Sequence, residues 1–251
     1  MDLPGILQET TATLYVVAGY LPLARERVVK EGPLVRFRFA VLIVVVALGG
    51  LTGCIGAQQV RPDNPRGAGG LVPSVDDKDA GLVGLAPNFD VKAYRVVAVA
   101  PFTVSESEIK DEGDHRFADK MTGYLHTQVV RRLTESGLFT RVVDLGAAEM
   151  PKDAGNILRL DGEITRLGRG SQVARYFAGA YGAGATRAQI ETRFVDVPTG
   201  RIVMVTADRR KASVGWFGGD DEEHLEESFD DAARDLAKFL TRLSRGESPA
   251  K

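Results

Sequence analysis

The sequence predicts an α/β (α+β) fold, a two-layer sandwich in which two main helices cover a mixed sheet of four to five strands, in the order β-α-β-β-β-β-α. Three observations predict it. Two segments carry apolar residues at helical spacing, which is typical of helices with one buried face. Other segments are short apolar runs or alternate with a period of two, as strands do. Glycine, proline and acidic residues separate these segments and indicate turns.

The first half of the predicted domain is a strand, a helix and a strand. The segment Tyr94–Phe102, YRVVAVAPF, is a short apolar run that ends near a proline and predicts a central strand. A helix is predicted from Asp114 to Glu135, and Gly137 suits the left-handed residue that follows a helix. Its apolar face consists of Phe117, Met121, Tyr124, Leu125, Val129 and Leu133. The next strand is predicted over Leu138–Leu145, and this order allows one right-handed crossover.

Three strands and a helix complete the predicted domain. Ile157–Leu167 and Arg187–Val195 alternate between apolar and polar residues, as half-buried strands do. A turn at 196–200 joins the second of them to Arg201–Arg209 as a hairpin. The last helix begins at the acidic cluster 220–223, which complements the helix dipole and which we interpret as a solvated turn rather than a metal site. Its apolar face consists of Leu225, Phe229, Ala232, Leu236, Leu240 and Leu243, with Leu236 expected in the core.

An apolar run precedes the only cysteine of the chain. Arg36 and Arg38 flank it, and Phe39–Leu48 contains ten uninterrupted apolar residues. A membrane-spanning helix needs about 20 such residues, whereas the core of a signal peptide needs about 7–15. The run and its basic flank therefore predict an export signal. A buried strand over Val41–Val46 is the alternative.

The residues Leu51 to Cys54, LTGC, resemble the lipobox of bacterial lipoproteins. The resemblance implies cleavage before Cys54, a diacylglyceryl group on its sulfur and often an acyl chain on the new amino group. Two or three acyl chains anchor a protein stably, at about 0.8 kcal/mol per buried methylene, where one chain is marginal. This covalent lipid is the only cofactor that we expect. The alternative is a buried free cysteine.

These assignments divide the chain into five segments. Residues 1–34 are expected to be an extension that results from a start codon assigned too early, with initiation at position 34 or 35, and 35–53 are the signal peptide. The lipidated cysteine and a flexible tether occupy 54–89, where glycine, proline and aspartate are dense and no period persists. Such a tether would span about 30–35 Å, although an irregular lead-in packed on the domain is the alternative. A globular periplasmic domain over 90–245 and a tail over 246–251 follow.

The predicted domain resembles known envelope lipoproteins. The segments VVAVAPF, GLFTRVVDL, LRLDGEITRL and RFVDVPTGRIV follow one another as in the periplasmic domains of the curli secretion channel subunit and of the lipoprotein activators of penicillin-binding proteins. Residues 168–203 more specifically resemble a bacterial lipoprotein domain of unknown function, and the resemblance extends over about 94–243. It implies the fold and an envelope location, and it supplies no catalytic residues. The spanning hairpins of the curli channel have no counterpart here, so no pore is expected.

Composition and motifs exclude several classes of function. The formal net charge of −2 gives no overall positive field for nucleic acid. His115, His126 and His224 show no metal-ligand spacing, and each is expected at the surface or half-buried. The chain has no G-x-S-x-G nucleophile elbow, and its sole thiol is expected to be acylated. We therefore expect no catalytic residues, no metal site and no enzyme activity.

A candidate partner surface lies in a glycine-rich segment and in the segment after the last predicted strand. It consists of Arg175, Tyr176, Phe177, Tyr181, Trp216 and Phe217. The glycines precede a strand instead of opening a helix, which departs from nucleotide-binding patterns, and close packing of a short helix on the sheet is the alternative to a partner-facing loop. We expect a lipid-anchored, periplasm-facing module that binds another envelope protein or a cell-wall component. The resemblance to bacterial lipoproteins favours the outer membrane, because Ile55 follows the cysteine in place of the aspartate that often retains lipoproteins in the inner membrane. A small-ligand receptor or an undescribed enzyme is the alternative, which a large apolar pocket would favour.

Overall fold

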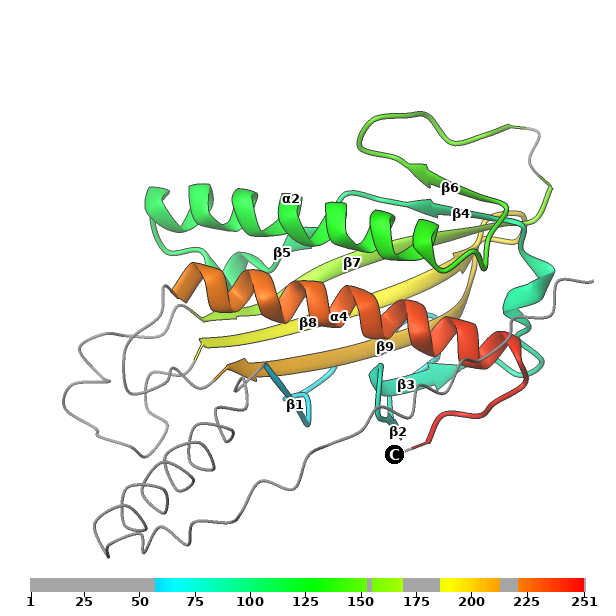
Figure 1. Cartoon of the computed structure of the whole chain (residues 1–251), viewed down its shortest axis with the longest axis horizontal. Coiled ribbons are helices and arrows are strands. Elements are labelled where there is room, and N and C mark those ends of the chain that lie inside the picture. Colours follow the sequence, from blue (N-terminus) through cyan, green and yellow to red (C-terminus); the bar gives the residue numbers. More distant parts are fainter. Residues whose placement is uncertain (1–56, 153–154, 169–185, 213–220, 251) are drawn as a thin grey trace, which may run out of the picture. The chain divides into compact units, whose positions relative to one another are not determined.

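The computed structural model describes residues 57–152, 155–168, 186–212 and 221–250. Contacts divide the chain into Met1–Gly53 and Cys54–Lys251, and all described residues belong to the second unit. That unit is the predicted two-layer α/β sandwich, with two long helices side by side on one face of a large mixed sheet (Figure 1). The helices are α2 (Glu112–Glu135) and α4 (Asp221–Ser244).

The sheet has nine described strands, more than the four to five expected. They are β1 (Gln58–Val60), β2 (Val75–Asp77), β3 (Gly81–Leu85), β4 (Val96–Val99), β5 (Thr103–Val104), β6 (Arg141–Asp144), β7 (Ile157–Gly168), β8 (Thr186–Asp196) and β9 (Arg201–Ala212). The order across the sheet is β2-β3-β9-β8-β7-β4-β6, with β1 paired to β9 and β5 paired to β7. The pairs β4–β6, β4–β7 and β5–β7 are parallel, and the others are antiparallel. Two single 3-10 turns, η1 (Val91–Ala93) and η2 (Glu106–Glu108), flank β4 and β5.

Both helices have the predicted buried faces. The α2 helix begins where the Asp111 carboxylate accepts the backbone N–H of Asp114 at 2.9 Å, and it ends before Gly137, whose φ is +63°. Its buried stripe consists of Ala118, Met121, Leu125, Val129 and Leu133, while Phe117 and Tyr124 are half-buried. Every predicted core residue of α4 is buried except Leu243, which is partly buried. These stripes place the main core between the helices and the sheet.

The hairpin of β8 and β9 is confirmed. The Gly200 N–H donates to the Asp196 carbonyl at 2.7 Å, and Gly200 has a φ of +69°, which a residue with a side chain rarely adopts. The register sets Ile190 opposite Asp208 and Thr186 opposite Ala212. The two strands therefore run together over nearly their whole length.

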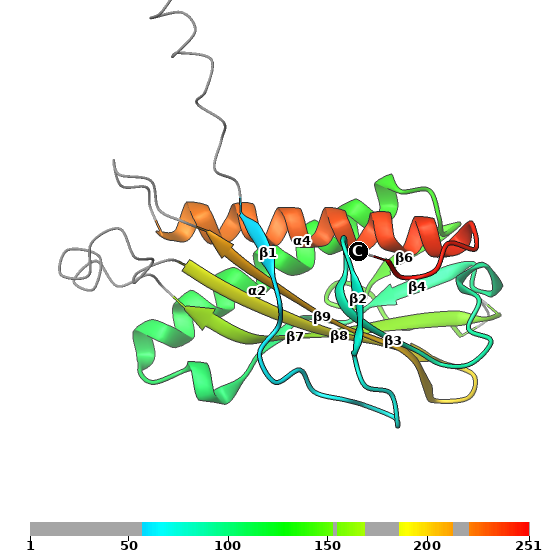
Figure 2. The same cartoon turned by 90° about the horizontal axis from the view of Figure 1, so that it is seen from below.

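The prediction of a flexible tether is wrong for residues 57–89. Three strands form there: β1 and β3 pair with β9, and β2 pairs with β3. Between β1 and β2 the chain crosses the face of the sheet that the helices leave open (Figure 2). The Asp63 N–H donates to Gln189 Oε1 at 2.8 Å, and Arg66 forms an ion pair with Glu163 at 2.9 Å. Because backbone pairing and polar side chains hold this segment, no apolar period reveals it in the sequence.

Candidate functional site

The predicted lipid attachment site and partner surface lie outside the described residues. These residues are Cys54, Arg175, Tyr176, Phe177, Tyr181, Trp216 and Phe217. The chain leaves the described domain toward the partner-surface segments after Gly168 and after Ala212, at one end of the sheet. Within the described ranges, no three His, Cys, Asp or Glu side chains gather as a possible metal site. No helix in those ranges is long and apolar enough to cross a membrane.

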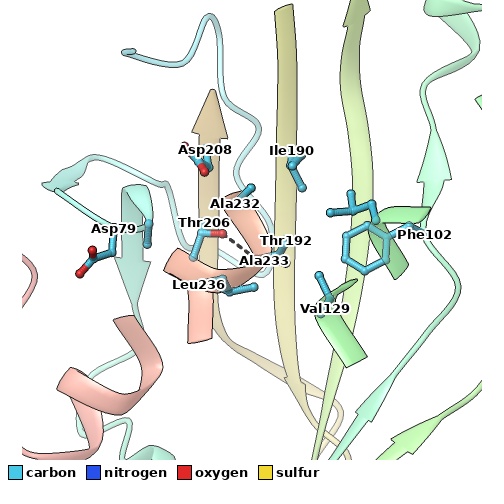
Figure 3. A pocket seen from close by; sticks show the side chains of 12 residues that line it. Asp79, Phe102, Val129, Ile190, Thr192, Thr206, Asp208, Ala232, Ala233 and Leu236 are labelled. Atoms are coloured by element: carbon cyan, nitrogen blue, oxygen red, sulfur yellow. Dashed lines mark hydrogen bonds between the residues drawn. The ribbon is translucent and has the colours of Figure 1, made fainter. Parts of the chain in front are cut away.

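A cavity of about 20 Å³ lies between the sheet and the two helices (Figure 3). The Thr192 and Thr206 hydroxyls share a hydrogen bond of 2.6 Å in its wall, and Phe102 and Leu236 face it from either side. This volume holds about one water molecule. Sites for small organic ligands occupy about 300–1,000 Å³. This cavity is therefore too small for a small organic ligand.

A buried ionic cluster joins β9 to α4. Arg210, which is 4% exposed, donates to Asp208 Oδ2 at 2.9 Å and to Asp235 Oδ2 at 3.0 Å. Burial raises the pKa of Asp208, although Arg210 opposes this shift. Burial also acts to raise the pKa of Asp235, but hydrogen bonds from Lys238 and Arg210 outweigh it and lower that pKa. Gln59 adds a hydrogen bond to Asp208 at 3.1 Å, so the cluster also holds β1.

A second buried carboxylate fastens the end of α4 to the β2–β3 turn. The Asp77 side chain is fully buried, and both of its oxygens accept from Arg242 Nη2 at 2.7 Å. It also accepts the backbone N–H groups of Asp79 at 2.9 Å and Ala80 at 3.0 Å. Burial acts to raise the pKa of Asp77, but Arg242 and these N–H groups outweigh it, so the pKa is lowered. The ion pair and the hydrogen bonds of Asp77 therefore hold the β2–β3 turn against the C-terminal end of α4.

An Asp77→Asn substitution should lower the free energy of unfolding by about 1.5–3 kcal/mol at pH 7, because it removes charge-assisted hydrogen bonds in a buried site. The folded pKa of Asp77 lies below its unfolded value, so the carboxylate stabilises the fold above pH 4 and loses this effect as the pH falls through the folded pKa. Urea melts at pH 7 and at pH 3 should therefore show a smaller difference between variant and wild type at pH 3. Asp119→Asn, at an exposed position on α2, is the control and should change stability by less than about 0.5 kcal/mol. Equal losses in the two variants would contradict the assigned role.

An open groove of about 560 Å³ lies between the C-terminal halves of α2 and α4, beside the β2–β3 turn. Its charged lining is mainly cationic, with Lys78, Arg132, Arg234, Lys238, Arg242 and Arg245 against Asp79 and Glu135. Four of these cations form ion pairs with acidic neighbours. Lys78 and Arg245 take part in no side-chain ion pair among the described residues. The groove can therefore offer two uncommitted cations to an anionic partner.

A histidine–aspartate pair fastens the turn after β6 onto α2. His126 Nε2 lies 2.7 Å from Asp144 Oδ1, which also accepts the Gly146 N–H at 2.7 Å. The hydrogen bond from His126 lowers the pKa of Asp144. The ring of Phe102 packs edge-on against the imidazole at 6.2 Å, and His126 is half-buried as expected. The hydrogen bond between His126 and Asp144 therefore holds the turn after β6 against α2.

Neither the groove nor the two buried ionic clusters were predicted from the sequence. The cations of the groove come from segments that are far apart in the sequence, and only those on α4 show a regular spacing. Arg234, Lys238 and Arg242 follow one another at intervals of four residues, which places them on one helix face. That stripe, next to the apolar face, could have indicated a cationic surface.

A family model described as a domain of unknown function (DUF4410) matches residues 88–240, which is well over half of the 251 residues. No protein with a curated description matches the chain.

Several solved structures are similar to the chain. A PelC dodecamer from Paraburkholderia phytofirmans has 12% identity and a TM-score of 0.39, over 61% of this chain and 94% of that one. A DUF330 protein from Xanthomonas campestris has 10% identity and a TM-score of 0.40, over 65% and 94%. The lipoprotein GNA1162 from Neisseria meningitidis has 15% identity and a TM-score of 0.34, over 61% and 99%. At these scores and identities the three structures carry no argument about the function of this chain.

Proposed function

We propose that this chain, which belongs to the DUF4410 family, is a lipid-anchored, non-catalytic binding module of the bacterial envelope. One observation supports a binding module most strongly, namely the contrast between two hollows of the domain. The internal cavity between the helices and the sheet measures about 20 Å³, whereas the open groove lined by charged side chains measures about 560 Å³. Such a groove suits the anionic surface of a macromolecular partner, because complementary charge guides and orients an encounter. The proposed partner presents an acidic protein segment to the groove.

The lipid anchor is supported by the apolar run and the lipobox-like residues that end at Cys54. A Cys54→Ser substitution should abolish incorporation of labelled palmitate and leave an uncleaved precursor, because the thiol that accepts the lipid is gone. Thr52→Ser keeps a small residue before the cysteine and should label like the wild type. Labelling of the Cys54→Ser protein at the wild-type level would contradict the proposal. We assign the protein to the outer membrane because Ile55 follows the cysteine, and fractionation on a density gradient tests that assignment.

The groove is tested by reversing its two uncommitted cations. Lys78→Glu combined with Arg245→Glu should weaken binding of fluorescent poly-glutamate, a probe for acidic protein segments, by about fivefold or more, since each exposed charge contributes on the order of 0.5–1 kcal/mol. Fluorescence anisotropy at low salt is the measurement, because salt at physiological strength screens charges beyond about 8 Å. The control, Lys110→Glu with Arg116→Glu, makes the same charge change at the exposed start of α2. Equal weakening by both double variants would show that only net charge matters and would contradict a role for the groove.

A receptor for a small anion is the second candidate function, because the groove volume falls within the range of about 300–1,000 Å³ that ligand sites occupy. Calorimetric titration with inorganic phosphate separates the two candidates. Saturable one-to-one binding that the Lys78→Glu and Arg245→Glu pair abolishes would favour the receptor. Absence of such binding, together with poly-glutamate binding at the groove, would favour the module for acidic protein segments.

A further inference from the structure

The strand β1 is fixed to the sheet immediately after the expected lipid attachment site. Gln58 pairs with Lys211 of β9, and the Gln59 amide donates to Asp208 at 3.1 Å and to the Asp79 carbonyl at 3.2 Å. Only four residue steps separate Cys54 from Gln58. A chain of four residues reaches at most about 14 Å when fully extended. A lipid on Cys54 would therefore hold the start of β1 within about 14 Å of the bilayer, far less than the tether expected from the sequence.

The end of the sheet at which β1 pairs with β9 lies opposite the β8–β9 turn. Strand β9 extends over twelve residues, Arg201–Ala212, which corresponds to about 36–40 Å. Strand β1 pairs with its last part, at Arg209, Arg210 and Lys211 (Figures 1 and 2). The turn and the C-terminal ends of both long helices lie toward the other end (Figure 1). The short anchor and the long axis of the sheet together place the two ends at different distances from a membrane.

Two cations lie side by side at the β1 end. The register sets Arg187 of β8 directly opposite Lys211 of β9, and Lys211 opposite Gln58 of β1. Like charges directly opposite on neighbouring strands destabilise a sheet. Neither side chain forms an ion pair with an acid among the described residues. An anionic surface in contact with this end would remove that repulsion, and each cation near anionic phospholipid contributes about 1 kcal/mol of attraction.

We propose that the end of the sheet formed by Gln58, Arg187 and Lys211 rests on the phospholipid headgroups, with the β8–β9 turn directed away from the bilayer. This inference depends on the lipid anchor of the proposed function. It assigns the protein an orientation in which the β1 end of the sheet meets the membrane and the β8–β9 turn lies at the far end of the domain. The bilayer surface is then a second binding partner of the folded domain, in addition to the covalent anchor.

The orientation is tested with two labelled proteins that keep the native anchor. Because Cys54 is the only cysteine and is blocked when lipidated, Gln58→Cys and Thr199→Cys each provide one thiol for a fluorophore, at the β1 end and in the β8–β9 turn. Both proteins are reconstituted in vesicles of phosphatidylethanolamine and phosphatidylglycerol that carry nitroxide on the headgroups. Quenching should be several-fold stronger at position 58 than at 199, because the two positions differ by about 35 Å in height. Equal quenching, or stronger quenching at 199, would overturn the proposal.

Two further measurements separate the contact from the anchor. The double variant Arg187→Glu with Lys211→Glu should reduce quenching at position 58 by about half, because each membrane-facing cation contributes about 1 kcal/mol. The control is the double variant Arg95→Glu with Arg141→Glu, which changes two exposed cations elsewhere and should leave the quenching unchanged. No effect of the first pair would overturn the cationic contact. Flotation of every protein with the vesicles is checked first. A wild-type protein that does not float would contradict the lipid anchor itself, whereas one that floats with equal quenching at both positions contradicts only the orientation.

Discussion

Replacement of Arg210 by Met should lower the free energy of unfolding by about 3–5 kcal/mol, because it leaves the buried Asp208 carboxylate without its cation and removes one cation from Asp235. The guanidinium contacts Asp208 at 2.8 Å and Asp235 at 3.0 Å, and all three residues are buried. A methionine fills similar volume, so the loss reports the uncompensated charges and not a cavity. Urea unfolding at pH 7 is the measurement.

The control for this experiment is Arg159→Met. Arg159 forms an ion pair with Asp161 at 2.9 Å, but its side chain is 39% exposed. Exposed pairs contribute about 0–1 kcal/mol, so this variant should stay close to the wild type. Similar losses in the two variants would show that the cluster at Arg210 is solvated and does not join β9 to α4.

Replacement of Phe229 by Ala should lower the free energy of unfolding by about 3–5 kcal/mol, through lost burial and the cavity that remains. Phe229 lies on α4 with no exposed surface and belongs to the main core beneath the helices. This loss is a large part of the stability of a typical domain, about 5–15 kcal/mol. Circular dichroism during urea unfolding provides the measurement.

Val72→Ala is the matched truncation at the surface. Val72 is 60% exposed, so its loss should change stability by less than about 0.5 kcal/mol. If Phe229→Ala unfolds at the same urea concentration as Val72→Ala, the terminal helix is not packed on the sheet in solution. The two-layer architecture would then be wrong for α4.

The elements that the sequence predicted correctly are those with an apolar period. Both long helices and the hairpin of β8 and β9 repeat apolar residues at the spacing of their structure, and the short apolar run at Val96–Val99 forms β4. The first three strands were missed because β1 is polar, β2 has only three residues and β3 contains two glycines. Their stability comes from pairing with distant β9, which local sequence cannot reveal.

The ionic cluster at Arg210 was only partly accessible from the sequence, because the predicted strand ended at Arg209 and no register was predicted. The structure sets Asp208 and Arg210 opposite the inward residues Ile190 and Ala188. Charges on the inward face of a strand require buried partners, and Asp235 on the last helix supplies one. The groove was less accessible, because Lys78 reaches it only through the pairing of β2 and β3, which the sequence did not predict. A charge on the inward face of a strand thus indicates that a buried partner is needed, whereas a surface assembled from three separate segments leaves no such indication in the sequence.

The intact mass of the protein, extracted from membranes with detergent, reports on the lipid anchor, from which the envelope location and the orientation of the domain follow. We expect a chain that begins at Cys54 and carries the added mass of a diacylglyceryl group, with or without an acyl chain on its amino group. A mature protein with an unmodified Cys54, or one that retains a peptide covering Arg25 to Lys30, would contradict it.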